Sequence, residues 1–347
     1  MRVFWRSSRM ATSTTTAASR PYMPSRRNSP GMSEVSSTQQ RCKTPVGYLW
    51  PVRITPSHIA DDHAAGIYAL TTDGTTLYSG SADKHVAGWD LHTGRPSGFA
   101  VRMQQAVYSV RHLSESNTLL VGNAHGGVHV IDLDAKKEVR LLQVHKKGVF
   151  DFCTLPGGRL AVIGGEGSVS IWNQASFELI RQIPLSGNKL RSTRMAVENA
   201  LAICDTSGPL HLLNATTLQP ATTFKGHERG TNCVAAHPSK PTLISGGRDA
   251  HLRVWSLETH EEVLALPAHN FSIYALSFSP DGNYLATASF DKTVKIWEAG
   301  SLALLARLER PALDAHRASV NALVWAANDH LITAGDDKRI IHWHLEP

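Results

Sequence analysis

The amino-acid sequence predicts an all-β fold built from seven repeated units of roughly 42 residues. Three observations lead to this prediction. A short motif recurs at a nearly constant spacing, strand-like segments lie between its copies, and a chain of 347 residues has room for seven units. Self-similarity at a fixed period of roughly 20 to 50 residues indicates a repeat architecture, in which each unit packs on its neighbours.

The motif is clearest between Ala286 and Gly300, where the sequence reads ATASFDKTVKIWEAG. Asp291 stands at a turn, six residues before Trp297, and a short β-branched run separates them. In the seven units the anchor position of the motif is occupied by Trp89, Ile131, Trp172, Leu213, Trp255, Trp297 and Trp343. Successive anchors are 42, 41, 41, 42, 42 and 46 residues apart. The motif is well formed in four units and degenerate in the second, third and fourth.

Each unit also contains short β-branched and aromatic segments between turn residues. In the sixth unit these segments are SIYALSFS at 272–279, YLATAS at 284–289 and TVKIWEA at 293–299, separated by Pro-Asp-Gly and Asp-Lys turns. Their nearly continuous apolar character indicates strands that are buried on both faces. A single unit cannot bury both of its faces, so a stack of units that closes on itself is the stable arrangement.

On these motifs the chain resembles the WD-repeat family over roughly residues 50 to 347. The resemblance implies a seven-bladed β-propeller with one four-stranded blade per repeat. It divides the chain into an N-terminal tail at 1–50 and a propeller at 51–347.

The seventh repeat lacks an outermost strand, because the sequence ends at Pro347, four residues after Trp343. Before the first repeat, residues 50–63 read WPVRITPSHIADDH, an extended stretch without a partner of its own. We expect about residues 52 to 60 to complete the seventh blade and so to remove exposed strand edges.

Polar residues recur at fixed positions before the anchor in the four well-formed repeats. The resemblance implies that they form hydrogen-bonded tetrads in the order Trp, Ser or Thr, His and Asp. The expected sets are His63, Ser79, Asp83 and Trp89; His227, Ser245, Asp249 and Trp255; His269, Thr287, Asp291 and Trp297; and His316, Thr333, Asp337 and Trp343. Buried polar groups cost free energy unless they are paired, so a complete set stabilises one geometry.

The second, third and fourth repeats depart from this pattern, and we expect no tetrads in them. Their residues at the Asp position are His125, Glu166 and Ser207, and those at the Ser or Thr position are Val121, Val162 and Ile203. The departure has two interpretations: drift in repeats that apolar packing alone can hold together, or a face specialised for a partner.

The residue types of the tetrads are also those of a hydrolase triad. A catalytic nucleophile occurs once and needs an oxyanion hole, whereas this set occurs four times with a Trp attached. Neither a Gly-x-Ser-x-Gly elbow nor a phosphate-binding Gly-x-x-x-x-Gly-Lys loop occurs in the sequence. We therefore expect a non-catalytic interaction scaffold without cofactor or metal. The alternative is a propeller enzyme, in which two or more titratable side chains would converge on the central funnel.

Composition bears on the expected partner and environment. The four cysteines, Cys42, Cys153, Cys204 and Cys233, show no paired spacing, which fits a reducing compartment. Residues 1–33 contain six arginines and no acidic residue, so the rest of the chain has 35 minus 6, or 29, basic residues against 29 acidic ones. A neutral ring has no electrostatic reason to bind nucleic acid. Nor is any stretch apolar enough for a membrane span. We expect protein or peptide partners, and a monomeric ring within a larger complex.

The tail at 1–50 is rich in Ser, Thr, Ala and Arg and is expected to be disordered. Such a composition also describes an organelle transit peptide. The alternatives are an ordinary extension, or an upstream start with true translation from Met32. We expect a cytoplasmic protein, with organelle import as the alternative.

The resemblance also implies where the propeller would bind a partner. The innermost strand of each blade begins near the mouth of the channel, and the residue after its first apolar position points into that mouth. These residues are Tyr68, Tyr108, Phe150, Arg191, Asn232, Tyr274 and Asn321, and the residues before the turn, on the same face, are Ala82, Ala124, Gly165, Thr206, Arg248, Phe290 and Asp336. Aromatic residues and Arg dominate interface hot spots. The predicted site therefore consists of Tyr68, Tyr108, Phe150, Arg191, Arg248, Tyr274 and Phe290; the alternative is that these rings only pack inside the channel.

Overall fold

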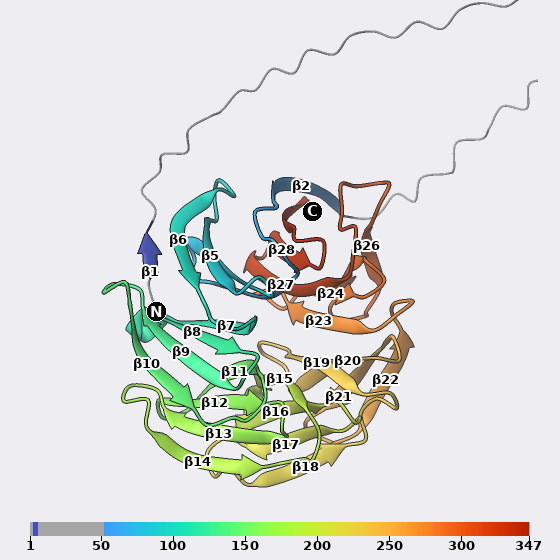
Figure 1. The fold of residues 1–347 in the computed structure, drawn as a ribbon. Coiled ribbons are helices and arrows are strands. Elements are labelled where there is room, and N and C mark those ends of the chain that lie inside the picture. The colour runs from blue at the N-terminus through green and yellow to red at the C-terminus, as the bar shows by residue number, and fades with distance from the viewer. Residues whose placement is uncertain (1–2, 6–51, 347) are drawn as a thin grey trace, which may run out of the picture.

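Seven antiparallel sheets make up the part of the chain that the computed structural model describes, residues 3–5 and 52–346. The sheets follow one another around a ring in chain order, as the colour gradient in Figure 1 shows. Six of them have four strands, and the first has a fifth, β1 (Val3–Trp5). The all-β, seven-bladed propeller predicted from the sequence is confirmed.

Each blade is a meander whose four strands run from the central channel outward. From the first blade to the seventh, the innermost strands are β3 (Ile67–Thr72), β7 (Val107–Leu113), β11 (Val149–Leu155), β15 (Leu190–Met195), β19 (Thr231–Ala236), β23 (Ile273–Phe278) and β27 (Val320–Ala327). The second strands are β4 (Thr76–Ser81), β8 (Thr118–Asn123), β12 (Arg159–Gly164), β16 (Ala200–Asp205), β20 (Thr242–Gly247), β24 (Tyr284–Ser289) and β28 (His330–Gly335). Two short 3-10 helices, η1 (Ser114–Ser116) and η2 (Val197–Asn199), lie between first and second strands.

The two outer positions of each blade complete the meander. The third strands are β5 (His85–Asp90), β9 (Gly127–Asp132), β13 (Ser168–Asn173), β17 (Leu210–Asn214), β21 (His251–Ser256), β25 (Val294–Glu298) and β29 (Ile340–Glu346). The outermost strands are β6 (Pro96–Arg102), β10 (Lys137–Gln143), β14 (Leu179–Pro184), β18 (Pro220–Phe224), β22 (Glu262–Pro267), β26 (Leu304–Leu308) and β2 (Arg53–Ala60). Each innermost strand contacts the innermost strands of both neighbouring blades, β27 and β3 included, so the ring is closed.

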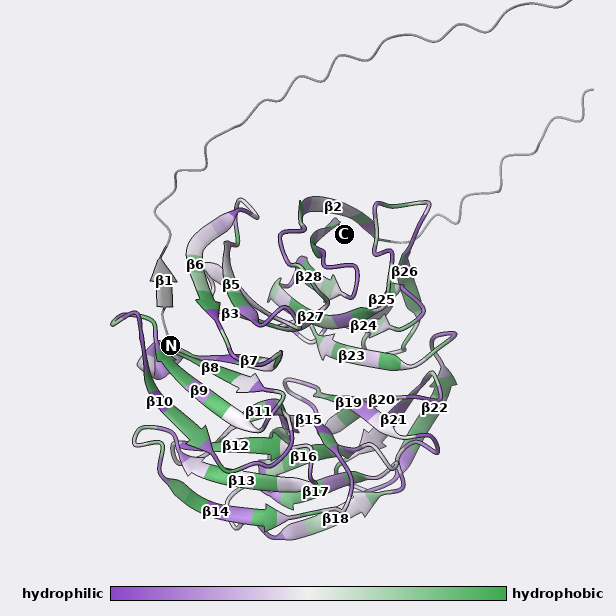
Figure 2. Ribbon diagram, in the orientation of Figure 1, coloured by the Kyte–Doolittle hydropathy of each residue, from purple (hydrophilic) through white to green (hydrophobic). Residues whose placement is uncertain are grey.

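The core lies between the blades, because the second strands are buried on both faces. All six residues of β8 are buried, and so are five of six in each of the other second strands. In β12, Ala161 and Ile163 pack with the fourth blade, while Leu160 and Val162 pack with the second. Figure 2 shows the result as green strands joined by purple loops. Each fully buried Leu or Ile stabilises this sandwich by about 1.5 to 3 kcal/mol.

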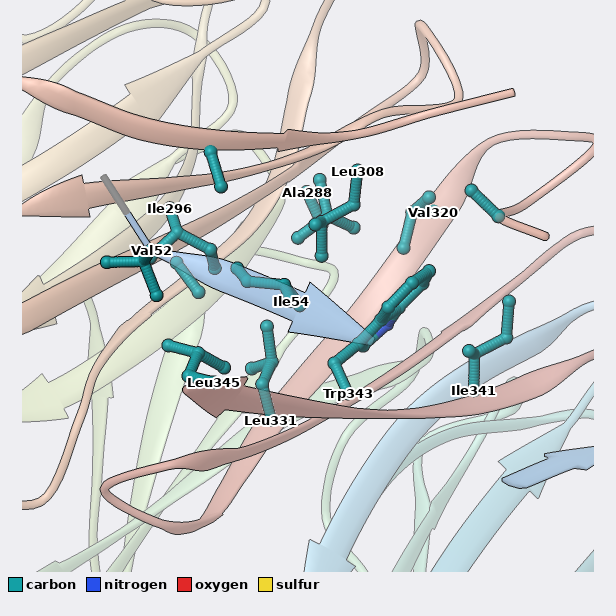
Figure 3. Packing of buried hydrophobic residues seen from close by; sticks show 14 of the residues in the cluster. Val52, Ile54, Ala288, Ile296, Leu308, Val320, Leu331, Ile341, Trp343 and Leu345 are labelled. Carbon is teal, nitrogen blue, oxygen red and sulfur yellow. The ribbon is translucent and has the colours of Figure 1, made fainter. Parts of the chain in front are cut away.

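The outermost strand of the seventh blade comes from the other end of the chain. β2 pairs antiparallel with β29, with Ile54 opposite Leu345. Val52 and Ile54 are buried in a cluster that the sixth and seventh blades share, and Figure 3 shows them beside Ile296 and Leu345. β2 thus occupies the position at which we expected residues 52 to 60 to complete the blade, because its pairing covers the otherwise exposed edge of β29.

Three residues of the predicted tail are also part of a sheet. β1 adds to the outer edge of β6, with Val3 opposite Val101 and Trp5 opposite Phe99. The strand lies within the tail that we expected to be disordered, and the β propensity of Val, Phe and Trp favours it there. The remainder of the tail, with the question of a transit peptide, lies outside the described residues. No helix among the described residues is long and apolar enough to cross a membrane.

The four expected tetrads are present as hydrogen-bonded sets. In the sixth blade, Trp297 Nε1 donates to Thr287 Oγ1 at 3.0 Å, and His269 Nε2 lies 2.8 Å from the same hydroxyl. His269 Nδ1 lies 3.0 Å from Asp291 Oδ2. Burial opposes ionisation of Asp291, but the hydrogen bond from His269 and those from its neighbours outweigh it and hold the pKa of this carboxyl well below its usual range. The same contacts, at 2.7 to 2.9 Å, join the members of the sets that end at Trp89, Trp255 and Trp343.

The third blade has a fifth tetrad, so the expectation that it lacks one is wrong. Trp172 Nε1 donates to Ser170 Oγ at 2.8 Å, and His145 lies 2.8 Å from that hydroxyl and 2.5 Å from Glu166 Oε1. Ser170 on β13 stands opposite Val162 on β12. The hydroxyl has thus moved to the neighbouring strand and still reaches the same partners, while the Glu replaces the Asp with one more methylene. A His 27 residues before Trp172 was the signal that could have revealed it.

The second and fourth blades have other polar networks in place of tetrads. In the second, His129 Nδ1 lies 2.7 Å from Glu138 Oε1, and its Nε2 lies 3.1 Å from Asn123 Nδ2. In the fourth, the Ser207 hydroxyl donates to Asp205 at 2.7 Å. Their anchors Ile131 and Leu213 are apolar and fully buried, so these two blades are held mainly by side-chain packing.

Asp291→Ala is expected to lower the free energy of unfolding by about 2 to 4 kcal/mol, because it leaves buried His269 and two backbone N–H groups without their acceptor. Trp297→Ala is expected to cost a similar amount, through the cavity it leaves. Ser207→Ala in the fourth blade is the control and should be much milder. Denaturant unfolding measures all three, and equal losses for Asp291→Ala and Ser207→Ala would contradict the role given to the tetrad.

Ser170→Ala tests the fifth tetrad. It removes the hydroxyl that both Trp172 and His145 contact, and leaves two buried polar groups unpaired. We expect a loss of about 1 to 3 kcal/mol in the free energy of unfolding. The same substitution at Ser176, in the exposed turn of this blade, should have little effect. A loss no larger for Ser170→Ala than for Ser176→Ala would show that the set contributes nothing to stability.

Four histidines lie where the last blade meets the first. They are His58 on β2, His330 on β28, and His342 and His344 on β29. The rings of His330 and His344 are stacked with centroids 4.4 Å apart, His330 Nε2 lies 3.1 Å from His342 Nδ1, and His58 contacts the backbone oxygen of His92 in the first blade. Burial, with the neighbouring histidines after it, lowers the pKa of His330 to about 4 and that of His342 to about 3. No group of three or more His, Cys, Asp or Glu among the described residues is placed to hold a metal.

These histidines are expected to make the ring sensitive to acid. The pKa values of His330 and His342 are lower in the folded chain than the usual 6.5, so between about pH 6.5 and pH 4 the unfolded chain binds more protons. The stabilisation from neutral His330 and His342 is complete above pH 6.5 and declines as the pH falls. His342→Gln is expected to flatten this decline in denaturant unfolding, whereas His125→Gln, in an exposed turn, is not. Parallel pH profiles for wild type and His342→Gln would contradict the assignment.

Candidate functional site

A β-bulge recurs at the start of every innermost strand. In each blade the register between the first and second strands skips one residue, such as Tyr68 between Ile67 and Ala69. A bulge leaves that residue unpaired and redirects its side chain. The skipped residues are Tyr68, Tyr108, Phe150, Arg191, Asn232, Tyr274 and Asn321. These are the seven inner-strand positions that the sequence placed at the channel mouth.

All seven skipped residues line one cavity of about 450 Å³ in the central channel. The cavity thus brings together five of the seven residues of the predicted site: Tyr68, Tyr108, Phe150, Arg191 and Tyr274. The other two, Arg248 and Phe290, are exposed and precede the turn between the second and third strands of their blades. Asn232 is buried and donates to the backbone oxygen of Ile273 at 2.9 Å, so it holds the fifth and sixth blades together.

An arc of aromatic rings runs along the mouth from the first blade to the third. The Tyr68 and Tyr108 rings meet edge to face with centroids 5.9 Å apart, and Tyr108 stacks on Phe150 at 5.2 Å. Two glycines make room for this pair. A Cβ on Gly148 would lie 2.8 Å from the Tyr108 ring, and one on Gly165 would lie 2.9 Å from the Phe150 ring. Any larger residue at either glycine would push the rings apart.

A second aromatic group stands on the sixth blade. The centroid of the Phe290 ring lies 6.1 Å from that of Tyr274 and 5.8 Å from that of Phe271, and both ring pairs meet edge to face. Phe271 is 58% exposed and Phe290 49%. The sequence analysis missed Phe271, although its position two residues after the tetrad residue His269, on the loop that leads into β23, was a usable signal.

Basic side chains lie between the two aromatic groups. The Lys189 Nζ is 4.7 Å from the centroid of the Phe150 ring, and the Arg191 guanidinium is 5.3 Å from that of Tyr274. Burial, followed by the charges of Arg191, Arg248 and Lys147, lowers the pKa of Lys189. None of these four cations has a carboxylate within ion-pair distance in the part of the chain that the structure describes.

The acidic groups of the channel, in contrast, are engaged. Asp151 accepts from Arg194 Nη1 at 2.5 Å and from the Thr193 backbone N–H at 3.0 Å. Asp336 accepts from the Ser319 hydroxyl and from Asn321 Nδ2 at 2.5 and 2.7 Å. The channel therefore holds more titratable groups than we expected of a scaffold, but both oxygens of Asp336 and the Oδ2 of Asp151 accept hydrogen bonds from neighbouring groups.

The comparisons with known proteins agree with this architecture. The family model described as WD domain, G-beta repeat matches residues 54–90, 136–173, 218–256, 260–298 and 309–344. Each matched span ends at or just beyond one of the five Trp anchors, in the five blades that have a complete tetrad. The third blade is among them, although its motif is degenerate.

The sequence identity between the chain and its relatives is low. It is 23% identical to the serine-threonine kinase receptor-associated protein of Mus musculus, over 66% of this chain and 65% of that protein. It is 24% identical to the ubiquitin fusion degradation protein 3 homolog of Caenorhabditis elegans, over 59% of this chain and 24% of the relative. The kinesin-like protein KIF21B of Homo sapiens is 23% identical over 91% of this chain and 21% of its own length.

The match thus spans 65% of the first relative and under a quarter of the other two. Because the family model matches more than half of the residues and each of its spans includes the Trp of a complete tetrad, the chain belongs to the WD domain, G-beta repeat family.

Proposed function

We propose that the chain is a non-catalytic interaction scaffold that binds a peptide segment or a protein loop across the mouth of its channel. The site consists of the predicted residues Tyr68, Tyr108, Phe150, Arg191, Arg248, Tyr274 and Phe290, together with Phe271. The observation that carries the proposal is the exposure of large rings around a recess. Phe271, Phe290 and Tyr68 are 58%, 49% and 38% exposed beside a cavity of about 450 Å³. Exposed apolar groups of this size mark interaction sites.

The residue types at the mouth support a protein or peptide partner. Tyr, Phe and Arg provide much contact area with few rotatable bonds, and an interface that buries them gains more free energy than one of small polar residues. The relative described as receptor-associated is named for an association with another protein, which is consistent with a scaffold role for this repeat. In this proposal the ring acts as a monomer within a larger complex. A cytoplasmic location is proposed on the cysteine usage alone.

A propeller enzyme is the alternative class, and the engaged state of the channel carboxylates argues for the scaffold. A general acid or base needs a free lone pair or proton within reach of a substrate. Asp151 is held by Arg194, and Asp336 by Ser319 and Asn321. We propose that these contacts hold the inner strands in place at the mouth.

A random peptide library displayed on phage and selected on the full chain tests the proposal. Phe290→Ala and Tyr274→Ala are each expected to weaken the binding of selected, synthesised peptides by about tenfold or more, as hot-spot residues do. Leu264→Ala is the control, because Leu264 is 43% exposed on the outermost strand β22, away from the mouth. Thermal unfolding confirms that each variant is folded. Selected peptides that bind all mouth variants as well as wild type would place the site elsewhere on the ring.

A further inference from the structure

Four cations lie at the mouth of the channel, and none of them forms an ion pair with a carboxylate among residues 52–346. Lys147 precedes the innermost strand of the third blade, Lys189 and Arg191 stand at the start of that of the fourth, and Arg248 precedes the β20–β21 turn of the fifth. The four cations share one local field, since the charges of Arg191, Arg248 and Lys147 all act on Lys189. We name Lys147, Lys189, Arg191 and Arg248 the basic arc.

What distinguishes the basic arc is the grouping of its cations, since the charges of Arg191, Arg248 and Lys147 all act on Lys189 and no ion pair with a carboxylate joins any of the four among the described residues. Elsewhere among the described residues, Arg194 is paired with Asp151 at 2.5 Å, Arg253 with Glu262 at 2.6 Å, and Arg339 with Asp314 at 2.9 Å. The propeller is neutral overall, with 29 basic and 29 acidic residues beyond position 33, so the arc is not the result of a general excess of cations. Grouping like charges on one rim costs stability, and an anionic ligand would offset that cost.

We propose that the mouth binds an acidic peptide segment, whose Asp or Glu carboxylates lie against the basic arc while a neighbouring aromatic or aliphatic side chain packs among Phe150, Tyr274, Phe290 and Phe271. This inference rests on the proposed function and specifies the chemistry of the partner at the same site. A Lys or Arg-rich segment would be repelled by the arc, and a neutral one would leave it unpaired.

Arg191 is suited to orient such a carboxylate. Its guanidinium lies over the face of Tyr274, 5.3 Å from the ring centroid, and makes no hydrogen bond to another described residue. Stacking on a ring restrains the guanidinium and leaves its N–H donors for a planar, bidentate contact with a carboxylate. Lys189 is held similarly over Phe150, at 4.7 Å. Each cation thus stands beside an aromatic surface, and the site pairs charge with apolar contact.

The distribution of the charges favours several carboxylates over one phosphate group. The four cations belong to three successive blades and are spread along the rim, whereas a phosphate group is bound by donors that converge on one point. Carboxylates on successive residues of an extended segment are spaced along its length and can meet such an arc. A cavity of about 450 Å³ between the rings is large enough to take one side chain of the segment.

Fluorescent synthetic peptides that differ only in charge test the proposal on the full chain. Each probe has a central phenylalanine, and the residues that flank it are all glutamate, all glutamine, all lysine or all phosphoserine. In fluorescence anisotropy at low salt, we expect the glutamate probe to bind about tenfold or more tightly than the glutamine probe, and the advantage to shrink as salt rises. The lysine probe is expected to bind more weakly than either.

The variant Lys189→Glu with Arg248→Glu reverses two charges at exposed positions and is expected to reverse the order of the glutamate and lysine probes. Lys225→Glu with Lys240→Glu is the matched control, since it changes the net charge equally and lies outside the arc. Equal affinities for the glutamate, glutamine and lysine probes would overturn the inference. Binding of the phosphoserine probe alone would replace the acidic segment by a phosphopeptide.

Failure of this inference can be told from failure of the proposed function. Probes of any charge that lose affinity in Phe290→Ala show that the mouth binds peptides, and their charge preference then decides the partner chemistry. If the Phe290→Ala substitution changes neither the affinity of the charged probes nor that of the selected library peptides, the proposed site at the mouth is wrong.

Discussion

Each blade of this propeller has two apolar faces, and neither can be covered by the blade's own residues. The second strands show the constraint most clearly, because alternate residues along one strand enter the cores on its two sides. A ring satisfies this requirement for every blade only if the last blade packs on the first. β2 pairs with β29, so the two ends of the described propeller lie in one sheet. The ring is therefore closed twice: by backbone hydrogen bonds within the seventh blade, and by packing of that blade on the first.

Hydrogen-bonded polar side chains add to this apolar packing in five of the seven blades. Five blades have a Trp, a hydroxyl, a His and a carboxylate joined in series, and each set ties the loop before the innermost strand to the turn after the second strand. Such a network specifies one geometry because every member is paired inside a low-dielectric core. The second and fourth blades have apolar anchors and still form the same meander, so a blade forms without a tetrad.

The mouth itself is a consequence of closing the ring. Seven innermost strands converge on one channel, and a bulge at the start of each directs one side chain into it. Some polar groups of the channel bond to the ring itself: Asn232 donates to the Ile273 backbone oxygen, Asn321 donates to Asp336, and Arg194 pairs with Asp151. The exposed rings and the cations of the third to sixth blades lie around the same mouth, and the cations of the basic arc form no ion pair with a carboxylate among the described residues. The proposed site rests on this combination of exposed rings and grouped cations around one recess.

Local sequence determined the repeat, the blade number, four of the tetrads, the segment that closes the ring and the seven positions at the mouth. These features depend on residue type at a fixed distance from an anchor, and the chain repeats that distance with little variation. Three features were decided by contacts between strands. The tetrad of the third blade depends on Ser170 facing Val162 across a strand pair, the strand β1 depends on the free edge of β6, and the engagement of Asp151 depends on Arg194, 43 residues away. The basic arc is likewise a feature that only the tertiary structure decided. Lys147, Lys189 and Arg248 are ordinary polar residues in their own repeats, and only the closed ring brings their charges together, because each comes from a different blade.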